Sequence, residues 1–150
     1  MSLNGEFAEE KTGWVKAQLE KVDAAGTTEV VDINGMSVVI YTIRGAKSGK
    51  LRRVPLMRVE HDGTYAAVAS KGGAPQHPAW YHNIKAHPEV EVQDGSSHAD
   101  AVAREIDGAE RDEWWQRAVK AYPPYAEYQT KTDRQIPVFL IEPAQAATSA

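Results

Sequence analysis

The stretch TTEVVDINGMSVVIYTI, residues 27–43, indicates what kind of fold this chain adopts. It consists of two runs rich in β-branched residues, 27–33 and 37–43, and Asn34-Gly35 stands between them. An Asn-Gly pair between such runs is a strong signal for a two-residue turn, because both residues tolerate the positive φ that the turn requires. The stretch therefore predicts an antiparallel β-hairpin.

The same strand pattern recurs later in the chain, with Asp-Gly at two of the turns. The further predicted strands are residues 52–60, 64–70, 89–93, 99–106 and 136–142. Short strands joined by tight hairpins argue against a doubly wound parallel sheet. They favour a small barrel or sandwich of about seven antiparallel strands.

The segment before the hairpin predicts a helix over residues 13–25. Its apolar residues Val15, Leu19 and Val22 recur at helical spacing, and Gly26 follows as a stop signal.

Two more helices are predicted between the strands. One begins near Pro78 and ends before Pro88, since proline favours the first helical position and restricts the residue before it. The other begins at Asp107, which forms a capping box with Glu110. Its apolar stripe consists of Trp115, Val119 and Tyr122.

The length of 150 residues predicts one domain, residues 1–150, with a helical N-terminal segment at 1–27 and a disordered tail at 144–150. No apolar run approaches the ~20 residues that cross a bilayer, and the first residues lack the charged start and apolar middle of a signal peptide. The absence of cysteine excludes disulfides and thiolate metal sites, and it agrees with a cytoplasmic location.

The charge is unevenly distributed along the chain. Residues 44–58, RGAKSGKLRRVPLMR, hold six basic residues and no acidic one, whereas the remaining 11 basic residues stand against 21 acidic ones. The net charge of −4 argues against nucleic acid as a partner, and a basic island on an acidic protein favours one localised anionic ligand. The alternative is a solvated hairpin loop.

Two predicted loops combine glycine with a cation. In residues 45–49, successive N–H groups can form an anion-binding nest, although the spacing is not that of a nucleotide P-loop. In SKGG, residues 70–73, the glycines permit positive φ and let a flat ligand approach the backbone. Either loop alone fits a plain turn, but the two together favour a phosphate-bearing cofactor.

The histidines and hydroxyl residues show no familiar catalytic pattern. His77, His82 and His87 recur every five residues, which separates their side chains by ~140° on a helix, and no H-E-x-x-H occurs. We therefore expect no metal site. No Ser-His-Asp order or G-x-S-x-G elbow indicates a hydrolase, so an enzyme with this sequence depends on a cofactor for its chemistry. Trp80 and Ile84 are expected in the core.

Three tyrosines recur every three residues across Pro123-Pro124. The proline pair ends one helix and starts a short second one, which places Tyr125 and Tyr128 on neighbouring positions of one face. Together with Tyr122 they either pack under a loop or line a lid over a planar substrate.

Three motifs, TIRGAKSGKLRRVPL, ASKGGAPQHPAWYHNIKAHPEVEV and YPPYAEYQTKTDRQIPV, together resemble the deazaflavin (coenzyme F420)-dependent nitroreductase family of actinobacteria. The resemblance runs from Val30 to Pro143 and leaves the N-terminal helix and the tail outside. It implies a mainly β, α+β fold: a split β-barrel of six to seven antiparallel strands with an N-terminal helix and two or three flanking helices.

The resemblance also implies a set of site residues. One loop holds the phosphate and polyglutamate tail of the cofactor, a second lies along its ring, and a helix contacts its ribityl and ring end. The implied cofactor-binding residues are Lys47, Ser48, Gly49, Lys50, Arg52, Pro55, Ala69, Ser70, Lys71, Gly72, Gly73, Trp80, Tyr81 and Asn83. The implied substrate-binding residues are Met57, Tyr122, Tyr125 and Tyr128.

The function that follows is transfer of a hydride from reduced F420 to a planar conjugated acceptor, which is a quinone, an unsaturated lactone or ester, or a nitroaromatic. Ser70 and Tyr125 are the candidate catalytic residues, because their hydroxyls can bind the acceptor's oxygen or relay a proton. An FMN-dependent oxidoreductase on the same barrel and a non-catalytic deazaflavin or anion carrier are the alternatives. Monomer and homodimer, and a peripheral membrane contact through the N-terminal helix, stay open.

Two residues depart from the family pattern. Ala46 stands where the family often has an arginine, whose charge Arg44, Lys50 or Arg53 would have to supply. Met57 stands where some nitroreductases have a tyrosine facing the substrate.

Overall fold

The computed structural model describes residues 3–10, 13–33 and 35–144. Short 3-10 turns, labelled η, accompany the helices and strands. The elements in chain order are α1 (Gly13–Ala25), η1 (Thr28–Val30), β1 (Asp32–Ile33), β2 (Met36–Arg44), β3 (Leu51–Met57), β4 (Glu60–His61), β5 (Thr64–Val68), η2 (Lys71–Gly73), α2 (Ala79–Ala86), β6 (Glu89–Asp94), β7 (Ser97–Ile106), α3 (Gly108–Ala121), α4 (Pro124–Thr130) and β8 (Val138–Pro143).

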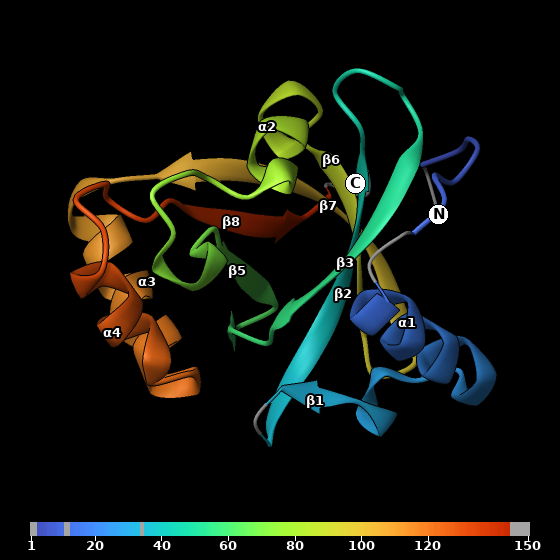
Figure 1. Cartoon of the computed structure of the whole chain (residues 1–150), viewed down its shortest axis with the longest axis horizontal. Helices are drawn as coiled ribbons and strands as arrows, with labels where there is room; N and C mark the ends of the chain where they lie inside the picture. Colours follow the sequence, from blue (N-terminus) through green and yellow to red (C-terminus); the bar gives the residue numbers. More distant parts are fainter. Residues whose placement is uncertain (1–2, 11–12, 34, 145–150) are drawn as a thin grey trace.

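The strands form one antiparallel sheet in the order β1-β2-β6-β7-β8-β5-β4, with β3 paired to β2. Strand β2 is shared between two neighbours, since Tyr41 lies opposite Val54 of β3 and Val92 of β6. The sheet curls so that β3 and β5 approach each other, and the helices lie around it (Figure 1). This is the split barrel that the sequence predicted.

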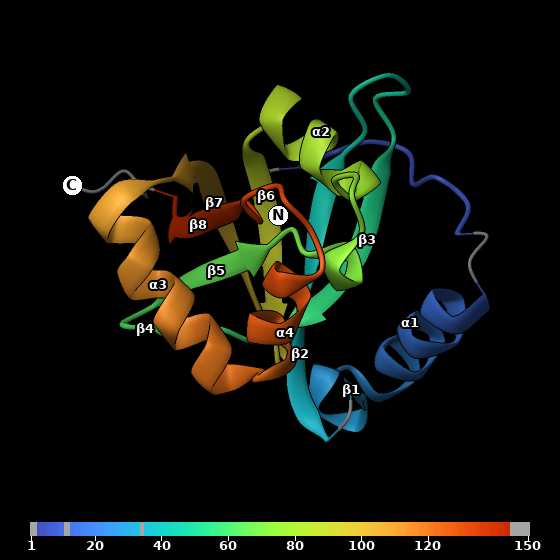
Figure 2. The same ribbon diagram turned by 60° about the vertical axis from the view of Figure 1, so that its left-hand side comes forward.

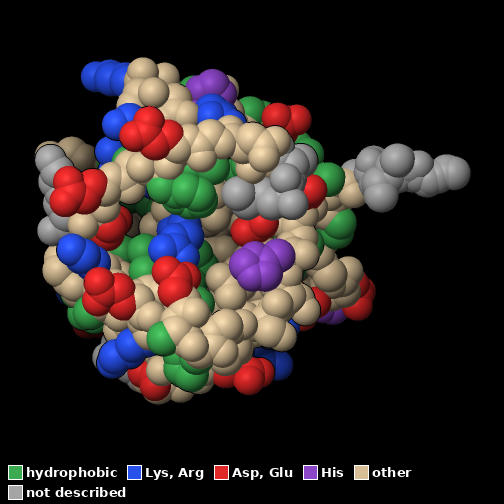
Figure 3. Space-filling model, turned by 90° about the vertical axis from the view of Figure 1, so that its right-hand side faces the viewer, with side chains coloured by type: hydrophobic (Ala, Val, Ile, Leu, Met, Phe, Trp, Pro, Cys, Tyr) green, Lys and Arg blue, Asp and Glu red, His purple; other side chains and the backbone are tan. Residues whose placement is uncertain are grey.

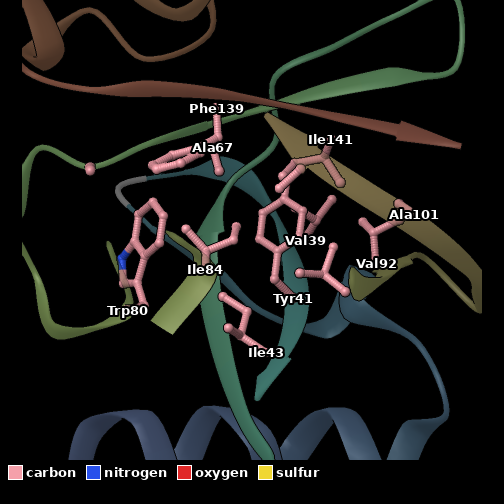
Figure 4. Close-up of a cluster of buried hydrophobic side chains, with 13 residues drawn as sticks. Val39, Tyr41, Ile43, Ala67, Trp80, Ile84, Val92, Ala101, Phe139 and Ile141 are labelled. Carbon is pink, nitrogen blue, oxygen red and sulfur yellow. The ribbon is translucent and has the colours of Figure 1, made fainter. Parts of the chain in front are cut away.

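Strand β2 is apolar almost throughout because both of its faces are covered. Tyr41 lies inside the barrel, whereas Ile40 packs on the other face against Leu19 and Val22 of α1. The barrel interior is filled by side chains from β2, β5–β8 and α2 (Figure 4). The buried residues labelled there are Val39, Tyr41, Ile43, Ala67, Trp80, Ile84, Val92, Ala101, Phe139 and Ile141.

A second buried cluster lies where α3 and α4 cover β5 and β8 (Figure 2). Trp114 and Ala118 of α3 are buried there together with Tyr125 of α4. Of the apolar stripe predicted for α3, Tyr122 is buried as expected, whereas Trp115 and Val119 are only partly buried at the margin of this cluster. The cluster holds α4 firmly against the barrel.

The predicted capping box of α3 is wrong. The helix begins after Asp107 as expected, but the Asp107 side chain makes no cap hydrogen bond. Glu110 instead accepts two hydrogen bonds from the guanidinium of Arg104 on β7, at 2.9 and 2.7 Å. A bidentate charged partner is a stronger competitor than a single backbone N–H.

Two predicted strands are shorter than expected. Within residues 27–33, only β1 pairs with β2, because η1 occupies the middle and Thr27 Oγ1 accepts from the Glu29 N–H at 3.2 Å. The strand predicted at 52–60 divides at Arg58, because β3 pairs with β2 whereas β4 pairs with β5. The chain thus changes its partner strand at this point.

The remaining elements are those that the sequence predicted, although strand ends differ by up to two residues: β5 ends at Val68 and β8 begins at Val138. Helix α1 spans the predicted residues, α2 begins after Pro78, and Trp80 and Ile84 are buried. Asn34 lies outside the described residues, but β1 and β2 pair across it. Of the predicted tail only Ala144 is described, and its N–H donates to Asp100 O at 2.9 Å.

Candidate active site

Two pockets adjoin along β3 and α2. The larger pocket, of about 900 Å³, lies at the basic segment, and the smaller pocket, of about 370 Å³, lies at the tyrosines. Pro55 and Trp80 line both of them. The two pockets therefore share a wall, and we refer to them together as the groove.

The larger pocket is built on the loop between β2 and β3. The loop is closed by its own hydrogen bonds and is tied to α2. Within the loop, the Gly45 N–H donates to Lys50 O at 2.8 Å and the Gly49 N–H donates to Gly45 O at 3.1 Å. The Lys50 N–H donates to Ser48 Oγ at 3.1 Å. The Ala46 N–H donates to Asn83 Oδ1 of α2 at 2.9 Å. Three of these N–H groups belong to the predicted nest at residues 45–49, and they are used within the protein, so the prediction is wrong for those three.

Four of the six basic side chains in residues 44–58 bind neighbouring parts of the protein: Arg58 binds Asp94, and the other three are Arg44, Lys50 and Arg53. The contacts run from Arg44 to Gly49 O and Asn4 O, from Lys50 to Glu6, and from Arg53 to both carboxylate oxygens of Asp23. The hydrogen bonds from Arg53 lower the pKa of Asp23. The three substitutes named for the arginine missing at Ala46 are therefore engaged by the fold. Lys47 and Arg52 are exposed and line the larger pocket.

The second glycine loop, residues 70–73, lies between the groove and α4. Lys71, Gly72 and Gly73 have φ values of 46°, 64° and 83°, so the predicted positive φ of the glycines is confirmed. A Cβ on Gly73 would lie 2.7 Å from Tyr128 O, whereas the space around Gly72 is open. Gly73 thus lets the loop rest on α4, while Ser70, Lys71 and Gly72 line the smaller pocket.

Tyr122, Tyr125 and Tyr128 meet in the smaller pocket, where the buried side chain of Met57 joins them. The hydroxyls of Tyr122 and Tyr128 are 3.4 Å apart, and the rings of Tyr122 and Tyr125 meet edge to face at 5.1 Å. Burial raises the pKa of Tyr125, and the hydrogen bond with Tyr122 raises the pKa of Tyr128 to about 12. The phenols of Tyr125 and Tyr128 therefore stay protonated near neutral pH and can donate hydrogen bonds.

Several residues implied by the resemblance do not line the groove. Tyr81 stacks on His77 with ring centroids 4.1 Å apart, and its hydroxyl donates to Glu105 at 3.3 Å. The other implied residues outside the groove lining are Gly49, Lys50, Ala69 and Gly73. Their cofactor-binding roles stay predictions.

Helix α1 contributes to the groove, although it lies outside the resemblance. Trp14 lines the smaller pocket and Val15 the larger pocket. The Trp14 residue is 51% exposed, so an apolar surface faces the opening. Its only sequence signal is an aromatic residue in the first turn of the predicted helix.

A third pocket, of about 490 Å³, lies beside α1 on the outer face of the sheet, where basic and acidic side chains gather in a hollow (Figure 3). Arg53 and Asp23 form an ion pair there, and Glu91 Oε1 lies 3.1 Å from His98 Nδ1. Arg52 and Arg53 line both this pocket and the larger pocket, but Lys47 lines the larger pocket alone and makes it the more favourable site for an anion. Within the described ranges, no three potential metal-ligating side chains cluster together.

The groove thus joins a basic end, an open backbone turn and a phenol-lined end. Comparison with known sequences connects this geometry to a family: a sequence model of the F420H(2)-dependent quinone reductases matches residues 14–143. The chain belongs to the F420H(2)-dependent quinone reductase family. It is an F420-dependent oxidoreductase, and coenzyme F420 is its cofactor, as the sequence predicted.

Relatives within and beside this family support the assignment. The F420H(2)-dependent quinone reductase Rv1261c of Mycobacterium tuberculosis is 35% identical over 108 residues, which cover 70% of this chain and 72% of that protein. A solved F420-H2 dependent reductase, FDR-A, is 65% identical with a TM-score of 0.68, covering 70% of this chain and 93% of its own. A chain described as a domain-swapped dimer is 59% identical with a TM-score of 0.71, covering 86% and 97%.

The groove fits the family's cofactor. A Cβ added at Gly72 would meet nothing within 4 Å, so a flat ring can approach the backbone there. Lys47 and Arg52 stand at the basic end, where the anionic part of such a cofactor requires cations. As for a membrane, no helix in the described part of the chain has the length and hydropathy of a span.

Proposed function

We propose that this protein binds F420 along the groove and reduces a quinone, or a related planar conjugated acceptor, in the smaller pocket. The observation that carries the proposal is that Pro55 and Trp80 line both pockets, which places the basic pocket directly beside the tyrosines. When bound, the cofactor supplies a hydride. Of the two oligomeric states left open above, we favour the homodimer, because a relative 59% identical is described as a dimer.

The chain's own residues position the two ligands. Lys47 and Arg52 bind the anionic part of the cofactor, and the turn at Gly72 brings the ring beside the smaller pocket. The tyrosine rings and Trp14 provide flat apolar walls for a conjugated acceptor. Holding both partners in contact range supplies much of the rate enhancement.

Reduction leaves negative charge on the acceptor's oxygen, and hydroxyl donors there stabilise it. Tyr125 is 3% exposed and keeps its proton because burial raises its pKa. Ser70 lines the same pocket, and its side chain makes no cap hydrogen bond to the turn that follows it. Both hydroxyls therefore donate to the developing oxyanion, and solvent supplies the proton that completes the reduction.

The experiment that tests this function is a pair of titrations followed by one turnover. F420 and, separately, FMN are titrated into the pure protein while cofactor fluorescence is recorded. The F420H2-loaded protein is then mixed with menadione, and reoxidation is followed. Preference for FMN would favour the flavin alternative, and tight F420 binding without turnover of any conjugated acceptor would favour the carrier.

The basic end gives the first expected result. Lys47→Ala and Arg52→Ala should each weaken F420 binding by about 1–3 kcal/mol, the range for hydrogen bonds to charged groups. The affinity of the parent should also fall as salt rises, since both side chains are exposed to screening. Lys120→Ala removes an exposed cation of α3 and serves as the control. Unchanged dissociation constants in both groove variants would leave the basic segment as a solvated loop.

The phenol-lined end of the groove gives the second expected result. Tyr128→Ala should raise the KM for menadione by roughly 2–10-fold, because it removes one aromatic wall worth about 0.5–1.5 kcal/mol. Tyr128→Phe keeps the ring and should retain the parental KM. Steady-state kinetics on both variants check this, and an unaltered KM in Tyr128→Ala would place the acceptor elsewhere.

A further inference from the structure

Arg134 lies beneath the second glycine loop, in the segment between α4 and β8. Its guanidinium donates from Nε to Ala74 O at 2.9 Å, from Nη1 to Ala69 O at 3.2 Å and from Nη2 to Ser70 O at 2.8 Å. These carbonyls stand on both sides of η2. One side chain therefore binds the backbone at the entrance and at the exit of the turn.

The turn that Arg134 binds is an unfavourable one. Three consecutive residues, Lys71, Gly72 and Gly73, have left-handed backbone angles. Glycine adopts this region freely, but lysine does not, because its Cβ approaches the following carbonyl. A backbone of this kind persists only where surrounding contacts hold it. Arg134 supplies such contacts from a charged donor, and these are stronger than neutral hydrogen bonds.

Arg134 also connects the turn to α4, the helix that carries Tyr125 and Tyr128. Gln129 of α4 donates from Nε2 to Arg134 O at 2.8 Å, and its Oε1 accepts from the Ile136 N–H at 3.0 Å. This fixes the segment that carries Arg134 relative to α4. Gly73 rests on Tyr128 O of the same helix. The guanidinium of Arg134 and the contact of Gly73 with α4 therefore together set the position of the turn relative to the tyrosines.

We propose that Arg134 is a positioning residue, which holds Ser70 and Gly72 in the geometry that F420 requires beside the smaller pocket. The proposal rests on the location of F420 in the groove argued above. Arg134 itself does not line either pocket of the groove. It acts through the turn.

His77 provides a way to separate this role from general stability. Its Nδ1 lies 3.0 Å from Arg134 Nη1 and accepts the hydrogen bond, which requires a neutral imidazole. The groups that face His77 are Arg134, the stacked Tyr81, His82 and the carboxylate of Glu105. Burial lowers the pKa of His77, and the charges of Arg134 and His82 lower it further, against an opposing effect of Glu105.

Protonation of His77 removes the acceptor and places a cation against Arg134. The neutral form, which the fold favours, prevails above the ordinary histidine pKa of about 6.5 and is lost as pH falls through the lowered value. We therefore expect the hydrogen bonds from Arg134 to the turn to weaken at acidic pH. His77→Asn keeps an oxygen acceptor near the Nδ1 position and does not titrate.

The test measures the dissociation constant of oxidised F420 by fluorescence, together with the thermal midpoint, from pH 5 to 8. Arg134→Met keeps the stem and removes every donor, and it should weaken binding about 10-fold or more. Arg134→Lys keeps the charge and should weaken it less. Arg104→Lys, on the outer side of β7, is the matched control and should bind as the parent does.

The pH profile supplies the decisive comparison. Binding by the parent should weaken in acid relative to His77→Asn, whereas any titration of the cofactor itself is common to both proteins. If Arg134→Met does not fold, the affinity of Arg134→Lys and the pH profiles of the parent and His77→Asn test the inference instead. If the folded Arg134 variants bind F420 with parental affinity while Lys47→Ala still binds it weakly, the inference about Arg134 is overturned and the proposed location of F420 stands. If Lys47→Ala and Arg52→Ala also bind normally, the cofactor's location is wrong and both proposals fall.

Discussion

Gly72→Val should abolish F420 binding while the protein remains folded. Gly72 lines the groove, has a φ of 64° and has no atom within 4 Å of a built Cβ, so a valine side chain would occupy the space left for the ring. The left-handed backbone should also reduce the free energy of unfolding by about 1–3 kcal/mol. F420 titration and thermal unfolding measure the two effects separately.

Gly95→Val is the matched control for this substitution. Gly95 lies in the turn between β6 and β7 with the same φ of 64°, and it lines none of the pockets described above. It should show the stability loss without the binding loss. Gly73 is unsuitable for the test, because a Cβ there would press on Tyr128 O at 2.7 Å. A Gly72→Val protein with parental F420 affinity would show that the ring does not approach this turn.

Tyr125→Phe should slow reduction of the acceptor by about 10–10³-fold and leave F420 affinity unchanged. The substitution removes one preorganised hydroxyl donor and keeps the ring, and losses of this size follow the removal of one oxyanion donor. Single-turnover reoxidation of bound F420H2 by menadione measures the step directly. The thermal midpoint should stay near that of the parent, because the buried ring contacts remain.

The control removes a hydroxyl that lies outside the groove lining. Tyr65 donates to Asp94 Oδ2 at 2.6 Å and lines neither pocket of the groove. Tyr65→Phe should therefore retain the parental rate. If Tyr125→Phe also retains it, the hydroxyl does not act on the acceptor and Tyr125 serves the packing of α4 alone.

The fold was predictable where local signals agree with the long-range partners. The Asn-Gly turn and the β-branched run of β2 specify a hairpin whatever surrounds them. The break at Arg58 could not be predicted, because it depends on β3 and β4 pairing with different strands. The capping box failed for a similar reason: Arg104, six residues before Glu110, takes the carboxylate that the local pattern assigned to the helix start.

The groove was predictable in part for the same physical reason. Lys47 and Gly72 lie in short glycine loops whose composition is visible in the sequence, and the tyrosines recur every three residues from the end of α3 into α4. Arg134 acts on carbonyls 60 or more residues away, at Ala69 and Ala74. Trp14 reaches the groove only because α1 packs across β2. Arg134 lies within the third motif and Trp14 in the first turn of the predicted helix, but neither signal shows that the residue reaches the turn or the groove.

The distribution of the four tryptophans has a practical consequence. Trp14 and Trp80 line the groove, whereas Trp114 and Trp115 stand on α3 in the second buried cluster. Trp80 lines both pockets, so its indole emission senses the arrival of either planar ligand. With the α3 pair replaced by phenylalanine, the unlabelled protein would carry its own optical reporter, able to time the arrival of the cofactor and of the acceptor as separate events.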